Sequence, residues 1–212
     1  GSLSGVDLSR FNNKRIEIES TKYKVKYNLQ DGDFIIGFIA RKTKEKGVLD
    51  LLNAFKYVSS LHSNVKLLLI GPDEEGLVKE LKSHDSTLFN KVIDIDTVSD
   101  HENFLFLLNV LILPSYREGF GSIVIDAASM GIPTIGTNIT GLKDAIIDNE
   151  TGLLFNKGDV DELTRLILFS ITNLDKIKVM GLNAKKRVQL YFSSEYLYTQ
   201  LDKFYEQLQS NY

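Results

Sequence analysis

The sequence predicts an α/β protein with a doubly wound parallel sheet of about six strands and helices on both faces. Short apolar runs, such as residues 34–40, 65–70 and 110–113, lack polar alternation, which is typical of parallel strands buried on both faces. Segments with helical periodicity alternate with these runs. Gly71 and Pro114 directly follow the second and third of these runs, at the strand ends where such Rossmann-like sheets bind ligands.

Composition narrows the functional classes. The formal net charge of −3 gives no support for general nucleic-acid binding, and we expect no nucleic-acid partner. The absence of cysteine excludes disulfides and thiolate metal sites. No apolar run reaches the length of a membrane span, and no signal peptide is recognisable. The first residue is Gly rather than Met, so we expect the chain to begin inside a longer protein.

The first half of the chain predicts alternating strands and helices. Residues 12–28 indicate a short helix and loop, and residues 34–40 the first strand. A basic loop, residues 41–47, leads into a helix whose apolar residues between 48 and 58 repeat with a period near 3.6. The elements that follow are a strand at 65–70, a helix near 74–83, a weaker strand at 92–96 and a short helix at 103–108.

Residues 110–133 form the stretch around which the chain is organised. Pro114 ends a buried strand, and a helix is expected over residues 122–130, with Ser122 as its N-cap. Gly131 and Pro133 are the usual stop signals. The turn between strand and helix contains two glycines, so backbone N–H groups and the helix dipole can face an anion there.

Two carboxylates flank this turn. Glu118 precedes the helix, and Asp126 lies about one turn, roughly 6 Å, from the helix start. A phosphate cradle with hydroxyl acceptors on either side suits a nucleotide sugar. The alternatives remain open: Asp126 as a carboxylate that stabilises the helix N-terminus, and Glu118 as a solvated loop charge.

The last part of the chain continues the pattern. We expect a strand at 133–136, a turn at Thr140 and Gly141 facing the same pocket, and helices at 160–172 and 175–191. The final helix carries one apolar stripe: Leu197, Leu201, Phe204, Tyr205 and Leu208.

Other polar motifs carry little chemistry. Asp-x-Asp occurs at 31–33 and at 94–96, but the tripeptide is short and we interpret both as solvated. His62, His84 and His101 lack metal-ligand spacing and are interpreted as surface residues. We expect neither a metal nor a cofactor.

Residues 113–121, Leu-Pro-Ser-Tyr-Arg-Glu-Gly-Phe-Gly, resemble the signature of the group-one retaining glycosyltransferases, which have two Rossmann-like domains (the GT-B architecture). Segments 137–144 and 150–155 are also similar, and the resemblance extends from about Gly5 to the C-terminus. One departure matters: the second acidic residue of the signature is usually Glu, whereas this chain has Asp126.

The resemblance implies a role for each matching residue. Arg41 and Lys46 would contact the donor diphosphate and offset charge on the leaving group. Glu118 would hold sugar hydroxyls, and Asp126 the ribose. The remaining substrate-binding residues would be Gly119, Phe120, Gly121, Ser122 and Ile123 in the cradle, with Thr97 and Val98 beside the nucleobase.

The resemblance also implies one half of a GT-B enzyme. Residues 1–30 would be a linker and first helix, 31–192 the donor-binding domain, and 193–212 a helix packing toward a missing N-terminal domain. The expected reaction transfers a sugar from a nucleoside diphosphate donor, with UDP-sugars favoured, to a growing surface polysaccharide or lipid-linked glycan, as in capsular or O-antigen synthesis. A nucleotide-sugar epimerase half and a non-catalytic nucleotide-binding domain are the alternatives. We expect a cytoplasmic location, with any contact to the inner face of the membrane made through the missing half.

Overall fold

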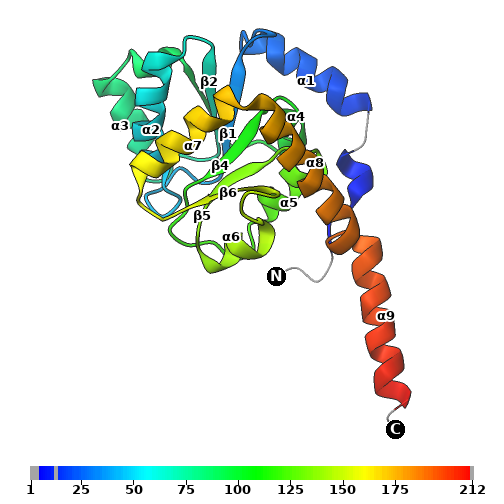
Figure 1. Cartoon of the computed structure of the whole chain (residues 1–212). Helices are drawn as coiled ribbons and strands as arrows, with labels where there is room; N and C mark the ends of the chain where they lie inside the picture. Colours follow the sequence, from blue (N-terminus) through cyan, green and yellow to red (C-terminus); the bar gives the residue numbers. More distant parts are fainter. Residues whose placement is uncertain (1–4, 12–13, 211–212) are drawn as a thin grey trace.

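Six parallel strands form one sheet in the order β3-β2-β1-β4-β5-β6 (Figure 1). The structure is a computed structural model and describes residues 5–11 and 14–210. The strands are β1 (Phe34–Ile39), β2 (Val65–Ile70), β3 (Val92–Ile95), β4 (Val110–Leu113), β5 (Thr134–Thr137) and β6 (Gly152–Phe155). The predicted doubly wound parallel sheet is confirmed, and its order reverses between β1 and β4.

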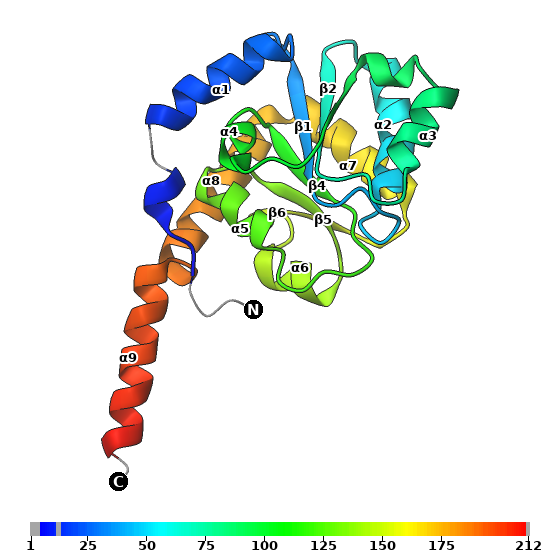
Figure 2. The same cartoon turned by 180° about the vertical axis from the view of Figure 1, so that it is seen from behind.

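Helices cover both faces of the sheet (Figures 1 and 2). One face packs against α2 (Val48–Leu61), α3 (Leu77–His84) and α7 (Val160–Thr172), with the short 3-10 helix η2 (Leu88–Asn90) nearby. The other packs against α4 (His101–Leu105), α5 (Ser122–Ser129), α6 (Thr140–Ala145) and the second half of α8 (Leu174–Tyr191), together with the 3-10 helix η1 (Leu8–Phe11). The helix α1 (Lys14–Lys26) lies against α4.

Burial on both faces explains the apolar strands. Along β1, Phe34, Ile36 and Phe38 enter the core beneath α2 and α7, whereas Ile35 enters the opposite core. Successive side chains of a strand point to opposite faces, so a strand covered on both sides needs apolar residues throughout. This requirement is what made these strands recognisable in the sequence.

Several boundaries differ from the predictions. The helix α3 begins at Leu77 rather than near residue 74, because Asp73 Oδ2 accepts hydrogen bonds from the N–H groups of Val78 and Lys79. The helix α4 runs from His101 to Leu105 instead of 103–108. The predicted N-cap of α5 is wrong: Gly121 occupies that position with a φ of 66°, and Ser122 is the first helical residue.

The N-terminal segment of the described chain pairs with the junction between α8 and α9. The Val6 N–H donates to the Phe192 carbonyl at 2.8 Å, and the Ser194 N–H donates to the Val6 carbonyl at 3.0 Å. From this junction α9 (Ser194–Ser210) extends away from the sheet (Figures 1 and 2). Two members of its predicted stripe, Phe204 and Leu208, have side chains outside the described residues. No helix in the described part is both long and apolar enough to cross a bilayer.

Candidate functional site

The loops that follow β1 and β4 meet at the carboxyl end of the sheet, where the strand order reverses. Gly47 closes the β1 loop with a φ of 70° and leads into α2. A Cβ atom on this residue would lie 2.1 Å from the Pro114 carbonyl oxygen at the end of β4. Only glycine allows this conformation at such a close approach, so its presence brings the two loops together. Open α/β sheets bind ligands at this point of the fold.

A charged pair spans the two loops. Lys46 Nζ donates to Glu118 Oε2 at 2.8 Å and to the Arg117 carbonyl at 3.3 Å. The side chains of Lys46 and Glu118 are only 14% and 19% exposed. Together with Glu45, Arg117 and Gly119 they line a shallow pocket of about 320 Å³. The structure thus brings together two residues that were predicted to share a site, and it joins them directly.

The N-terminus of α5 lies beside this pair. Gly121 is the N-cap, and the Val124 N–H donates back to its carbonyl at 2.8 Å. The first N–H groups of a helix, here those of Ser122 and Ile123, have no partner within the helix and carry the positive end of its dipole. Ser122 is exposed and Ile123 is partly buried. The two charges and the helix end therefore offer a place for an anion beside a carboxylate.

Two other cations of the β1 loop, Arg41 and Lys42, differ in burial and in their partners. Arg41 is 53% exposed, and its Nη1 donates to Glu74 Oε2 at 3.1 Å, so its guanidinium pairs with Glu74 whereas Lys46 pairs with Glu118. Lys42 is almost fully buried and donates to Asp94 Oδ1 at 2.5 Å and to the Ile95 carbonyl at 2.8 Å. Asp94 is exposed, as interpreted from the sequence, but its carboxylate pairs with the buried Lys42 ammonium and so holds the β1 loop against β3.

Asp126 has a partner that the sequence did not reveal. His101 Nε2 lies 2.9 Å from Asp126 Oδ2, and the two side chains are 23% and 15% exposed. Interpreting His101 as a surface residue was therefore wrong. It lies 25 residues before Asp126, and no spacing rule links the first residue of α4 to the middle of α5. Thr97 and Val98 precede α4; Thr97 is exposed and Val98 is partly buried against the core.

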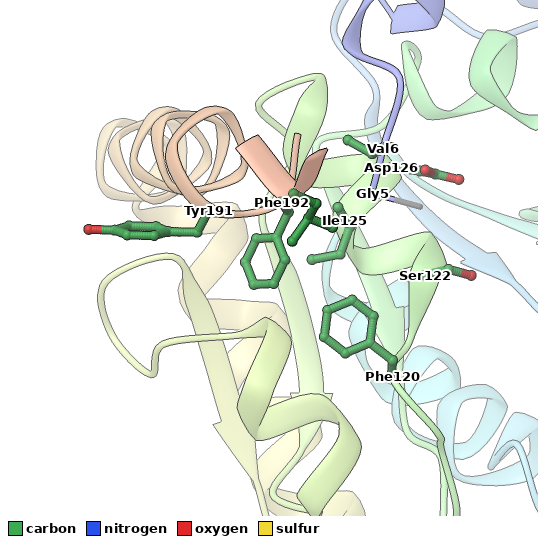
Figure 3. A pocket seen from close by; sticks show the side chains of 9 residues that line it. Gly5, Val6, Phe120, Ser122, Ile125, Asp126, Tyr191 and Phe192 are labelled. Carbon is green, nitrogen blue, oxygen red and sulfur yellow. The ribbon is translucent and has the colours of Figure 1, made fainter. Parts of the chain in front are cut away.

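An apolar pocket of about 370 Å³ lies between the first half of α5 and the α8–α9 junction (Figure 3). The side chains of Phe120, Ile125 and Phe192 converge there, whereas the Ser122 hydroxyl and the Asp126 carboxylate point away from them. The Phe120 and Phe192 ring centroids are 5.6 Å apart. The other residues that line it are Gly5, Val6, Tyr191 and Leu197. Phe120, predicted to bind substrate, thus directs its ring toward the α8–α9 junction.

No cluster of potential metal ligands occurs within residues 5–11 and 14–210. The charges at the junction of the β1 and β4 loops are instead a cation and a carboxylate, both supplied by the protein. A cation beside a carboxylate can act on a ligand through charge and hydrogen bonds.

Comparison with known proteins identifies the family and the fold. Residues 19–187 match the family model described as glycosyl transferases group 1. The capsular polysaccharide biosynthesis glycosyltransferase CapM of Staphylococcus aureus is 34% identical over 207 residues, which are 97% of this chain and 53% of CapM. The chain thus spans about half the length of that relative.

Solved structures share the fold. Alr3699/HepE of Anabaena has been crystallised with UDP and with UDP-glucose. It is 20% identical to this chain, and its UDP complex superposes with a TM-score of 0.83 over 96% of this chain and 56% of HepE. A C-terminal domain of the group 1 family glycosyl transferase LpcC from Francisella tularensis is 19% identical, with a TM-score of 0.76 over 89% of this chain and 99% of that domain. These neighbours include GT-B glycosyltransferases, and the chain has the fold of one half of that architecture. From the family match and the similarity to CapM together, the chain belongs to the group 1 glycosyl transferases.

Proposed function

We propose that this chain is the donor-binding half of a retaining glycosyltransferase that takes a sugar from a nucleoside diphosphate, with UDP as the favoured nucleotide. One observation carries the proposal: the Lys46–Glu118 pair lies beside the N-terminus of α5, where the strand order of the sheet reverses. A diphosphate needs the cation and the backbone N–H groups, and a sugar needs the carboxylate. The UDP and UDP-glucose complexes of HepE support the choice of nucleotide.

The phosphate end of the site follows from these contacts. The diphosphate occupies the N-terminus of α5, with Lys46 donating to it and Glu118 accepting from hydroxyls of the sugar. Arg41 joins them by leaving Glu74, because a solvent-exposed ion pair contributes only about 0–1 kcal/mol. Positive charge at the leaving diphosphate offsets the charge that develops there as the bond to the sugar breaks.

The nucleoside end extends from α5 toward α4. Asp126 accepts hydrogen bonds from ribose hydroxyls through the oxygen that does not contact His101. Thr97, which is exposed, and Val98 precede α4 and lie beside the nucleobase. The backbone between Gly119 and Ile123 lies along the diphosphate, between the places proposed for the sugar and for the nucleoside. This order places the donor across the end of the sheet.

The acceptor belongs to the part of the enzyme that this chain does not contain. The chain spans about half of CapM and nearly all of the C-terminal LpcC domain, which supports its place as the second half. Residues 1–30 then act as linker and first helix, residues 31–192 bind the donor, and residues 193–212 pack toward the other half. The apolar pocket at the α8–α9 junction would face that half. By analogy with CapM, the acceptor is a growing surface polysaccharide or lipid-linked glycan handled on the cytoplasmic side.

Nucleotide binding by the isolated chain tests the proposal. We expect UDP to raise the melting temperature, and uridine to raise it much less, because most of the contacts are to phosphate. Lys46→Ala should sharply reduce the difference, whereas Lys44→Ala, which removes an exposed cation from the same loop, should preserve it. If no nucleoside diphosphate among UDP, ADP and GDP stabilises the chain at millimolar concentration, the proposal is wrong.

A further inference from the structure

We propose that His101 is a positioning residue for the donor: it holds the Asp126 carboxylate so that one defined oxygen remains for the ribose. The inference rests on the proposed function, because it assumes that Asp126 binds the nucleotide. It assigns a role to a residue outside the glycosyltransferase signature at 113–121. It also gives a physical reason for an aspartate, rather than a longer acid, at position 126.

The geometry determines which atom donates. An ionised carboxylate only accepts hydrogen bonds, so the imidazole must carry its proton on Nε2 and donate to Asp126 Oδ2 at 2.9 Å. The bond fixes the χ1 and χ2 angles of Asp126 and engages one of its two oxygens. The second oxygen keeps its acceptor capacity. A carboxylate that is fixed before binding loses less conformational freedom when the ligand arrives, which favours affinity.

The residues on either side of His101 are fixed by hydrogen bonds from α1 and η1. Before it, Asp100 Oδ2 accepts a hydrogen bond from the Tyr23 hydroxyl of α1 at 2.7 Å. After it, Glu102 Oε2 accepts from Arg10 at 2.8 Å and lies 3.9 Å from His101 Nδ1. These contacts tie the start of α4 to the segment that precedes the sheet. The imidazole therefore stands on an anchored turn, which is what positioning another side chain requires.

The length of the Asp126 side chain matches this arrangement. With the imidazole nitrogen at 2.9 Å, no room remains between the two groups for an additional methylene. A glutamate at position 126 would either displace His101 or turn away from it. We therefore infer that Asp126 and His101 act as a pair in place of one longer acid. Removing the imidazole should make room for that longer acid.

Calorimetric titration separates this role from a structural brace between α4 and α5. The ligands are UDP and 2′,3′-dideoxy-UDP, which differ only in the ribose hydroxyls. His101→Ala should weaken UDP binding by about five- to tenfold, the effect of one hydrogen bond, and change dideoxy-UDP binding by less than about twofold. His101→Gln, which retains an amide donor, should recover most of the loss. His84→Ala, on the far face in α3, is the matched control and should change neither.

Double variants test whether His101 acts through Asp126. In the Asp126→Ala background, His101→Ala should have no further effect on UDP. Asp126→Glu should bind UDP poorly alone and better when combined with His101→Ala. Equal losses for the two nucleotides in His101→Ala, or additive losses in the double alanine variant, would overturn the inference.

The two proposals fail in different ways. If Asp126→Ala removes the preference for UDP over the dideoxy nucleotide but His101→Ala does not, only the role of His101 is wrong. If Asp126→Ala keeps that preference while Lys46→Ala weakens UDP binding at least tenfold, the role of His101 is wrong and the donor site stands. A chain that binds neither nucleotide would contradict the proposed function and this inference together.

Discussion

Lys46 is the residue whose removal should distinguish a diphosphate site from a structural loop. In the free protein its ammonium is paired with Glu118 at 2.8 Å and is largely shielded from solvent. Lys46→Ala removes the cation proposed to contact the diphosphate. It also leaves the Glu118 carboxylate without its partner, directly beside the place proposed for the phosphates.

The size of the effect can be worked from these contacts. A hydrogen bond to a charged group contributes about 1.5–3 kcal/mol, which corresponds to roughly a 10- to 150-fold loss of affinity for UDP. We expect the upper half of this range, because the unpaired carboxylate then repels the diphosphate. Arg41→Ala should give the lower half, since this side chain is half exposed and first has to leave Glu74.

Isothermal titration of UDP and uridine into each variant measures the effect. Uridine lacks phosphate, so its binding should change little in Lys46→Ala. Adding Glu118→Gln to Lys46→Ala should restore part of the UDP affinity by removing the repulsive charge. If UDP and uridine lose affinity equally, Lys46 supports the fold rather than the phosphate, and the reasoning fails.

Three further outcomes follow from the structure. Asp94→Asn should lower the free energy of unfolding by about 2 kcal/mol, measured in urea, because it leaves the buried Lys42 ammonium without its counter-charge; adding Lys42→Met should recover much of this. The hydrogen bond to Asp100 raises the pKa of Tyr23 to about 12. Burial alone would raise the pKa of Asp100, but hydrogen bonds from Tyr23 and Asn103 outweigh burial and hold that pKa below its usual range. The stability difference between wild type and Tyr23→Phe should therefore be constant near neutral pH. It should vanish as the pH rises from about 10 through 12, and shrink in acid as Asp100 is protonated; a difference independent of pH would contradict this. Finally, the isolated chain should transfer no sugar to a simple acceptor, because catalysis needs both reactants held across a cleft; measurable turnover would refute this.

The fold could be predicted from the sequence because its signals are local. Buried parallel strands need apolar residues on both faces, so β1 and β4 stand out as uninterrupted apolar runs and β2 as a run broken only by Lys66. The location of β6 was missed, since four residues between turn residues carry too little pattern. The N-cap of α5 was assigned to Ser122 by preference, but the close turn after β4 requires a positive φ, which Gly121 supplies.

The resemblance assigned Lys46 and Glu118 to one site, and the fold explains why these two residues meet. Lys46 and Glu118 each follow a central strand, and parallel strands bring their carboxyl ends to one edge. The sequence did not show that Lys42 pairs with Asp94 whereas Lys46 pairs with Glu118. Both are lysines of one basic loop, and only the folded loop determines where each side chain points. The bond between His101 and Asp126 depends on how α4 packs on α5, which is a tertiary contact without a sequence period.

Mapping UDP on the chain by amide chemical shifts is the most direct test of the donor site. A titration of UDP into isotopically labelled protein should move the amide signals of Lys46 and of residues 119–123 most, with smaller changes near Asp126. Uridine should leave the signals at the phosphate end, those of Lys46 and residues 121–123, unchanged. The contrary result is a set of UDP-induced shifts that avoids the junction of the β1 and β4 loops, which would show that the Lys46–Glu118 pair is not the donor site.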